Sequence, residues 1–245
     1  MRHTVLAALC LVLCIGSIWA QGEKRPGIVT DGLIAHFTFD EGAGDTVRDT
    51  VGGQVGKLVN AKFIPMPVGF ALEFDGKSGY MQCEPNDIVN PPWDHTLEAW
   101  VISYGLPNNN KTPGIVGMTP WFYGFAIRNG ILLSHLSEMG DGNLTSCRIE
   151  RNKWHHIVVT FDTQMMKMYK DGALVMSKES KWEVVSEGPK FYVGRSVNTE
   201  GRWGGYFEGA VDQVRIYNRA LTDEEVAQNY AATVGQVIEA PKTQE

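Results

Sequence analysis

From Gly27 to Tyr217 the chain alternates short apolar and aromatic runs with clusters of Gly, Asn, Asp and Pro. Runs of this length, rich in Val, Ile, Phe, Tyr and Trp, are typical of β-strands, and the clusters between them are typical of turns. The runs that we expect to form strands cover residues 32–39, 70–75, 79–83, 95–104, 114–118, 122–128, 131–136, 146–150, 154–162, 165–170, 173–178, 190–196 and 209–218.

Many short strands with no helix between them predict an all-β fold, an antiparallel sandwich of two sheets. Two dipeptides support this prediction, because Asn129-Gly130 and Asp171-Gly172 each lie between strand-like runs. Both dipeptides tolerate the positive φ angles of a two-residue hairpin loop. Each should therefore join neighbouring antiparallel strands.

A helix is predicted only near the end of the chain, in "LTDEEVAQNYAA". Thr222 is suited to be its N-cap, Glu225 completes a capping box, and Leu221 with Val226 fits a hydrophobic staple. We expect about three turns that close one domain over residues 28–235, followed by a flexible tail over 236–245.

Residues 1–20 are typical of a secretory signal peptide, with Arg2 before an apolar run and Ser17 to Ala20 ahead of Gln21. That run is too short to span a bilayer, so the sequence predicts a protein that is secreted or lies at the cell surface or in the periplasm. A lipoprotein signal ending at Cys14 is the alternative, although bulky Leu13 stands where a small residue is preferred.

Cleavage would leave Cys83 and Cys147, which are too few for a disulfide-built scaffold; we expect them to be unpaired. The whole chain has 22 basic and 28 acidic residues, and Arg2 would leave with the signal. This acidic balance argues against nucleic acid and anionic membranes as partners.

Two adjacent histidines, His155 and His156 in "KWHHIVVTFD", raise the question of a metal or catalytic site. Successive side chains of a strand point to opposite faces, so the two imidazoles cannot turn toward one ion. The other histidines are isolated and show no metal-binding spacing. We therefore interpret this pair as part of a strand that enters the core.

Six segments in order resemble the laminin-G-like jelly-roll domains of the concanavalin A-like superfamily. They are "GLIAHFTFDEGAGDTVRDTVGG", "ALEFDGKSGYMQC", "TLEAWV", "KWHHIVVTFD…MYKDGALV", "FYVGRS" and "FEGAVDQVRIYNRALTDEEV". The resemblance covers residues 31 to about 231. It implies two curved antiparallel sheets with the first and last strands as neighbours, frequently a calcium ion at the rim, and extracellular recognition, but no particular ligand.

The sequence lacks the motifs of the enzymes that share this superfamily. Glucanases carry a Glu-x-Asp-x-x-Glu strand that supplies the nucleophile and the acid/base, and no such spacing occurs here. A Gly-x-Ser-x-Gly elbow and a Walker loop are also absent from the sequence. We expect a protein that is not an enzyme; a glycan hydrolase or lyase with unrecognised carboxylates is the alternative.

Acidic residues at strand ends predict a structural calcium site, because calcium prefers several oxygen ligands gathered from loops. The candidates are Asp40 and Glu41 in "FDEGAGD", Asp75 in "FDGKSG", and Asp212 in the last strand. Neighbouring first and last strands would bring the four together at one end of the sandwich. Alternatively, Asp75 begins a turn, and Asp40 and Glu41 face water.

The loop from Asn198 to Tyr206 is the candidate ligand site. Trp203 lies there between glycines in polar sequence, where a core position is less natural, and sugar rings pack on exposed aromatic faces. The polar neighbours that would bind hydroxyl groups are Asn198, Glu200 and Arg202, and Trp121 after Pro120 is a further candidate. Alternatively, Trp203 folds back over the core.

The sequence thus predicts an exported, non-catalytic domain that binds a carbohydrate or glycoconjugate, with a structural calcium ion. The alternative partner is an extracellular protein, bound by an interaction or surface-structural module of the same fold. Exposed aromatic residues on one patch would favour the sugar, and a flat apolar patch or a long unpaired edge strand would favour the protein.

Overall fold

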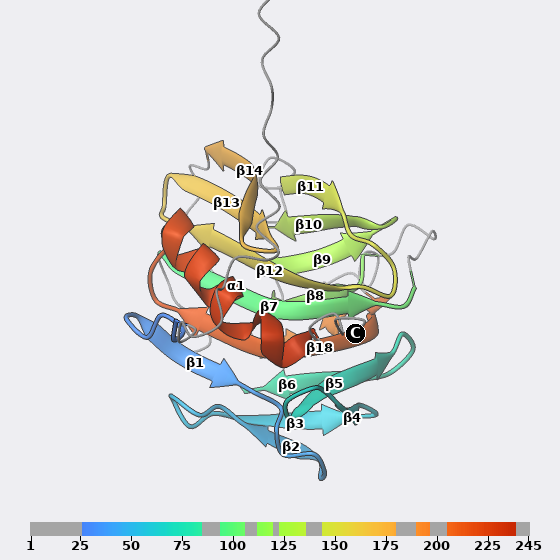
Figure 1. Ribbon diagram of the computed structural model, residues 1–245. Helices are drawn as coiled ribbons and strands as arrows, with labels where there is room; N and C mark the ends of the chain where they lie inside the picture. Colours follow the sequence, from blue (N-terminus) through green and yellow to red (C-terminus); the bar gives the residue numbers. More distant parts are fainter. Residues whose placement is uncertain are drawn as a thin grey trace, which may run out of the picture.

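The computed structural model describes residues 26–84, 94–105, 112–119, 123–135, 144–179, 190–196 and 205–238. Within these residues the chain forms two eight-stranded antiparallel sheets, one two-stranded sheet and one helix. Figure 1 shows the larger sheets packed on one another, with the helix running across the front. The predicted all-β sandwich is confirmed.

Sheet A is the sheet beside the helix. Its strands pair in the order β14 (Ala173–Glu179), β13 (Met165–Lys170), β12 (Trp154–Phe161), β7 (His95–Ser103), β18 (Glu208–Tyr217), β5 (Phe70–Asp75) and β4 (Lys62–Pro65). β1 (Leu33–Phe37) also pairs with β18, so the first and last strands are neighbours, as expected.

Sheet B forms the other layer. Its order is β11 (Leu144–Arg148), β10 (Ile131–His135), β9 (Tyr123–Arg128), β8 (Gly114–Thr119), β15 (Lys190–Val193), β6 (Tyr80–Cys83), β3 (Val55–Val59) and β2 (Thr46–Arg48). A small sheet of β16 (Arg195–Ser196) and β17 (Gly205–Tyr206) follows β15 in the chain.

Side-chain alternation along β12 divides the apolar residues between two layers. Ile157, Val159 and Phe161 belong to the large core between the sheets, whereas Val158 belongs to a smaller cluster between sheet A and the helix. The histidines divide in the same way: His155 shares the parity of Ile157, and His156 that of Val158. The prediction that they face opposite sides is confirmed.

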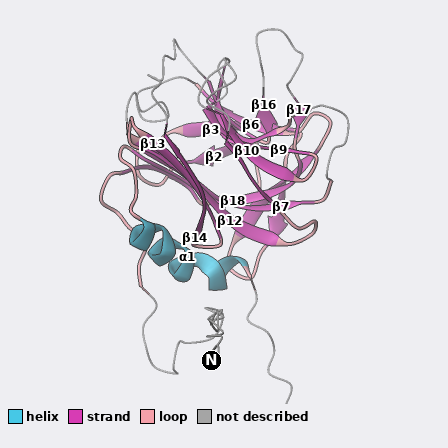
Figure 2. Cartoon of the chain, turned by 90° about the horizontal axis from the view of Figure 1, so that it is seen from above, coloured by secondary structure: helices cyan, strands magenta, loops and turns pink. Residues whose placement is uncertain are grey.

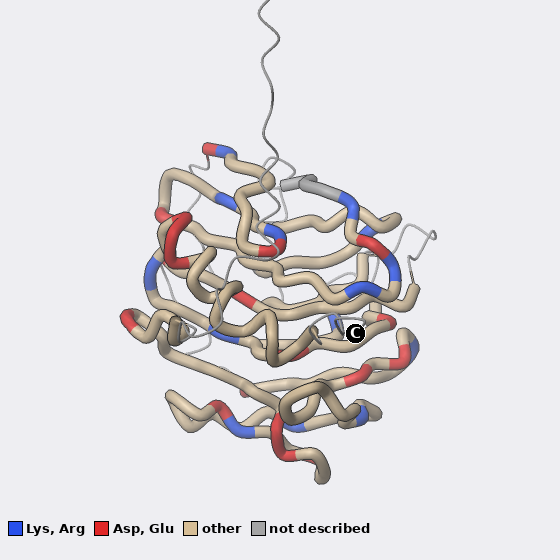
Figure 3. The backbone as a smooth tube through the Cα atoms, viewed as in Figure 1, with Lys and Arg blue, Asp and Glu red and all other residues tan. Residues whose placement is uncertain are grey.

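Helix α1 (Asp223–Val237) covers the outer face of sheet A and leaves sheet B on the far side of the sandwich (Figure 2). The predicted capping box is present, because the Thr222 and Glu225 side chains each accept a hydrogen bond from the other's backbone nitrogen. Three acidic residues follow in the first turn, red in Figure 3, where they complement the helix dipole.

The helix is longer than predicted, because it continues into residues that we expected to belong to the tail. Gln236 and Val237 are helical. Val237 is buried, and the carbonyl of Gln236 accepts a hydrogen bond from Val68 of the β4–β5 connection. This tertiary packing extends the helix although the sequence there has little amphipathic pattern.

Both predicted hairpins are present. Asn129 and Gly130 join β9 to β10 with φ angles of 52° and 73°, and Asp171 and Gly172 join β13 to β14 with φ angles of 53° and 78°. Positive φ at both turn positions is the type I′ requirement.

Cys83 is a free, buried thiol, as expected. It lies on β6, and four strands of sheet B separate it from β11, which contains Cys147. At about 4.8 Å between strands the separation is far beyond the roughly 7 Å limit for a disulfide. Among the helices of the described ranges, none combines the length and apolar character that a membrane span needs.

Candidate ligand-binding site

An aromatic cluster lies where sheet B meets the small sheet. It consists of Tyr80 on β6, Tyr192 on β15, Arg195 on β16 and Tyr206 on β17, and we name it the tyrosine–arginine cluster. The inward residues of β6 and β15 join the large core, so alternation turns the two tyrosines outward. The cluster is on the side of the sandwich away from α1 (Figure 2).

Gly194 positions Arg195 at this point. Its φ of 84° lies in the left-handed region, and a Cβ atom there would approach a Phe74 ring carbon to 2.6 Å. The glycine thus lets the chain turn tightly over the core between β15 and β16. Arg195 then pairs with Tyr206 across the small sheet.

Arg195 is in contact with all three aromatic rings. Its Cζ atom lies 4.8 Å from the ring centroid of Tyr80, 5.6 Å from that of Tyr192 and 5.2 Å from that of Tyr206. These distances are in the range of cation–π interactions. Tyr80 is also 5.8 Å from Tyr192 and 6.2 Å from Tyr206, centroid to centroid.

The cluster remains accessible at its surface. Tyr80, Arg195 and Tyr206 are partly exposed, and Tyr192 is 7% exposed. Burial raises the pKa of Tyr192, with the charge of Arg195 acting in the opposite direction, so this phenol is neutral at pH 7. A neutral phenol both donates and accepts hydrogen bonds. The cluster therefore offers aromatic surface, hydroxyl groups and one guanidinium.

Sequence reasoning missed Tyr80, Tyr192 and Arg195, although "GYMQC" and "KFYVGRS" were recognised as strands. The available signal was alternation: in each strand the tyrosine is out of phase with the apolar residues that fill the core. Tyr206 lies at the end of the loop that we predicted to carry the ligand contact.

The other predicted ligand residues lie outside the described residues: Asn198, Glu200, Arg202, Trp203 and Trp121. Residues 197–204 connect β16 to β17, the strands that contribute Arg195 and Tyr206. Their role in binding stays a prediction.

Among the four predicted calcium ligands, Asp75 is engaged in its own turn. Its Oδ1 accepts hydrogen bonds from the backbone nitrogens of Lys77, Ser78 and Gly79, and its Oδ2 accepts one from the Ser78 hydroxyl. These hydrogen bonds, led by that of Ser78, lower the pKa of Asp75 strongly despite the cost of desolvation. The alternative that Asp75 begins a turn is therefore correct.

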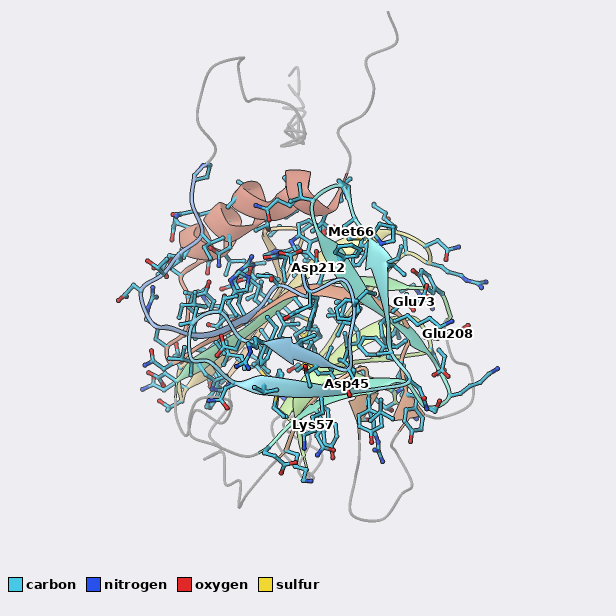
Figure 4. The ribbon with its side chains drawn as sticks, turned by 90° about the horizontal axis from the view of Figure 1, so that it is seen from below. Asp45, Lys57, Met66, Glu73, Glu208 and Asp212 are labelled. Atoms are coloured by element: carbon cyan, nitrogen blue, oxygen red, sulfur yellow. The ribbon has the colours of Figure 1, made fainter. Side chains whose placement is uncertain are left out.

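Asp40 and Asp212 lie near one another, whereas the Glu41 side chain is hydrogen-bonded to a different segment of the chain. The Glu41 carboxylate accepts a hydrogen bond from the backbone nitrogen of Arg48. The Asp40 carboxylate accepts one from the backbone nitrogen of Phe70. Asp212 is buried on the helix side of β18, above Asp45 and Lys57 in Figure 4. Burial raises the pKa of Asp212 to about 8, and the charge of Asp40 adds to this rise.

The four carboxylates do not form one cluster. In the described part of the chain, no group of three or more His, Cys, Asp and Glu side chains is arranged to hold a metal ion. Asp40 and Asp212 could contribute carboxylate oxygens to a calcium ion, whose other ligands would be backbone carbonyls and water. Calcium binding stays a prediction that rests on this pair.

The two histidines of β12 are held by acidic partners. His155 Nδ1 lies 2.8 Å from Asp171 and its Nε2 lies 2.7 Å from Glu150. His156 Nε2 lies 2.9 Å from Glu98, which is fully buried beneath α1. Each imidazole is thus fixed by structural contacts, in agreement with our interpretation of the pair.

Glu98 is the centre of a buried polar network between sheet A and α1. It accepts hydrogen bonds from Arg215 at 2.6 Å and from Asn229 at 2.7 Å, in addition to its contact with His156. The side-chain amide of Gln213 continues the network. Its Oε1 accepts a hydrogen bond from Arg215 and lies 2.9 Å from His36 Nε2. His36, which looked isolated in the sequence, thus belongs to the same network as His156.

The fold places the chain among the jelly-roll sandwiches, and the family comparison is specific. A family model described as the concanavalin A-like lectin/glucanases superfamily, Laminin_G_3, matches residues 75–227, more than half of the chain. The chain belongs to this family, as the resemblance of its motifs indicated.

Solved structures with the same fold come from larger proteins. A sialidase of Trypanosoma rangeli in complex with sialic acid has 20% identity and a TM-score of 0.66, over 86% of this chain and 35% of the sialidase. The receptor binding domain of botulinum neurotoxin C/D mosaic serotype has 15% identity and a TM-score of 0.67, over 84% of this chain and 52% of the neurotoxin chain. The binding domain of Paraclostridial Mosquitocidal Protein 1 has 16% identity and a TM-score of 0.65, over 81% of this chain and 52% of the mosquitocidal protein chain.

The chain thus spans between about a third and about half of these relatives. At such identities the likeness shows the fold alone.

Proposed function

We propose that the protein is an exported, non-catalytic recognition domain that binds a carbohydrate or glycoconjugate at the tyrosine–arginine cluster. The observation that carries this proposal is the grouping of three tyrosine rings, of which Tyr80 and Tyr206 are partly exposed, around Arg195 on the face opposite α1. The apolar faces of sugar rings pack on aromatic side chains, and phenol and guanidinium groups bind their hydroxyls.

Membership of the superfamily supports a binding role, and so does the likeness to the binding domain of a mosquitocidal protein and to the receptor binding domain of a botulinum neurotoxin. The residues between β16 and β17, with Trp203, would extend the contact along the ligand. A calcium ion at Asp40 and Asp212 would act structurally, by linking two neighbouring acidic side chains, away from the sugar.

The test is a glycan array probed with the mature chain and with two variants. Tyr206→Ala removes a partly exposed ring from the cluster, and Tyr230→Ala removes a partly exposed ring from α1 on the opposite face. We expect Tyr206→Ala to lose most of its array signal and Tyr230→Ala to keep it. A wild-type protein that binds no glycan on the array would contradict the proposal.

A second candidate function is recognition of a protein partner. Val51, Val55 and Val59 are 49%, 39% and 36% exposed at the β2–β3 end of sheet B, and Val59 pairs with Tyr80 across the strands. Exposed apolar surface of this kind is typical of interaction sites. Binding to a cell surface that persists after enzymatic removal of its glycans would favour the protein partner.

A further inference from the structure

The charged residues are distributed unequally between the two sheets. The strands of sheet B contain five basic residues, one each on β2, β3, β9, β11 and β15, and no Asp or Glu. They are Arg48, Lys57, Arg128, Arg148 and Lys190. The strands of sheet A also contain five basic residues, but they carry six acidic residues in addition: Glu73, Asp75, Glu98, Glu179, Glu208 and Asp212.

Sheet B therefore differs from the chain as a whole, in which acidic residues outnumber basic ones by 28 to 22. The basic side chains alternate with inward apolar residues, so they lie on the outer face of the sheet. Figure 4 shows Lys57 on the side far from α1. The tyrosine–arginine cluster lies on this same basic face.

Arg195 adds a cation at the centre of the cluster. Within the described part of the chain, no carboxylate forms an ion pair with it, whereas Lys190 on the neighbouring strand lies 3.7 Å from Glu84. Among the described residues its partners are aromatic faces, and a cation–π contact does not use the N–H groups of the guanidinium. A planar guanidinium presents these donors in a fork that matches a carboxylate or a sulfate.

We infer that the cluster selects acidic saccharides, with Arg195 binding a carboxylate or sulfate carried by a sugar ring that packs on the tyrosines. This inference rests on the proposed function and names the chemistry of its ligand. The phenol groups donate further hydrogen bonds to the anion, and the basic strands of sheet B attract acidic ligands from solution. A neutral sugar would gain only the aromatic contact.

Calorimetric titration of the mature chain with three trisaccharides tests the inference. Galactotriose is neutral, trigalacturonate carries carboxylates, and sulfated galactotriose carries sulfates. Because a hydrogen bond to a charged group is typically worth a factor of about 10 to 100 in affinity, we expect at least one anionic trisaccharide to bind that much more tightly than galactotriose. Comparison of the two anionic ligands distinguishes carboxylate from sulfate.

Two variants separate direct contact from the general field of the basic face. Arg195→Gln should remove the preference for the anionic trisaccharide and leave the melting temperature nearly unchanged. Arg148→Gln removes the same charge from an exposed position on β11, four strands from β15, and should lower affinity less than about threefold. Arg195→Lys keeps the charge but not the planar fork, and should restore only part of the preference.

Equal binding of neutral and anionic trisaccharides by the wild type would overturn the inference, and so would an Arg195→Gln variant that keeps its preference. Equal losses in the Arg195 and Arg148 variants would also overturn it, because the effect would then be one of general charge. If none of the three trisaccharides binds, acidic selection is contradicted, and the glycan array decides separately whether the domain binds carbohydrate.

Discussion

Replacing Glu98 with Gln should destabilise the fold strongly. Glu98 is fully buried and binds Arg215, His156 and Asn229 at once. Glutamine has nearly the same shape but no charge, so the variant leaves the Arg215 guanidinium buried without its counter-ion. Removing one partner of a buried ion pair typically costs about 3 to 5 kcal/mol.

The pKa of Glu98 gives a similar value for the stability that its charge contributes. Burial raises the pKa of Glu98, but the charge of Arg215 and the hydrogen bonds of His156 and Asn229 outweigh it and lower the pKa from 4.5 to about 2. A difference of one in pKa corresponds to about 1.4 kcal/mol, so ionised Glu98 stabilises the folded state by about 3 kcal/mol at neutral pH. At about 2 to 4 °C per kcal/mol, the melting temperature should fall by about 6 to 12 °C.

The pH dependence follows from the sign of this shift. A carboxylate with a lowered pKa contributes its full stability above the unfolded value of 4.5 and loses it as the pH falls toward 2. Urea denaturation of the wild type and of Glu98→Gln at pH 7 and at pH 3 measures the loss of stability and its dependence on pH. Glu179→Gln, at an exposed position, is the control. If Glu98→Gln lowers the free energy of unfolding by less than about 1 kcal/mol at pH 7, or by the same amount at both pH values, Glu98 does not stabilise the fold through its charge.

Three further predictions concern the network, the metal and the loop. Burial, with the charge of Arg215, lowers the pKa of His36 to about 4 from 6.5, so the unfolded chain takes up a proton there between pH 6.5 and 4 while the folded chain does not. The wild type should therefore lose stability as the pH falls through this range, and His36→Gln should flatten that part of the curve in urea denaturation. Millimolar calcium should raise the wild-type melting temperature relative to chelator, because binding the folded state alone stabilises it, and Asp212→Asn should abolish the rise; an unchanged wild-type melting temperature would end the calcium prediction. Trp203→Ala should weaken saccharide binding with little effect on melting, whereas a loss of about 3 to 5 kcal/mol in stability would show that this ring covers the core instead.

The elements that could be predicted are those whose local sequence determines their structure. Asn129-Gly130 and Asp171-Gly172 specify their hairpins through positive φ, and Thr222 with Glu225 specifies the helix start. Strands that were not predicted are short or interrupted by polar residues, namely β2, β3, β4 and β17. Their pairing depends on neighbouring strands in the sheet, which a local pattern does not report.

The candidate site was less predictable because it assembles residues that are far apart in the chain. Tyr80 and Tyr192 are brought together by β6 pairing with β15, a long-range contact that neither segment signals. The predicted calcium site failed to unite Asp75 with Asp212 because the oxygens of Asp75 are used in its own turn. The buried network likewise joins His36 to His156 only through the order of strands β12, β7, β18 and β1.

Binding of an acidic saccharide at the tyrosine–arginine cluster can be observed by NMR. The protein, labelled at its tyrosine rings, is titrated with trigalacturonate or sulfated galactotriose while the ring resonances are followed. Three of the tyrosines belong to the cluster, and Tyr169, Tyr217 and Tyr230 lie on the helix side of sheet A as internal controls. We expect shifts of the Tyr80, Tyr192 and Tyr206 resonances at the ligand concentrations where calorimetry detects binding. Shifts confined to the helix-side tyrosines, or none in the cluster on saturation, would contradict binding at the cluster.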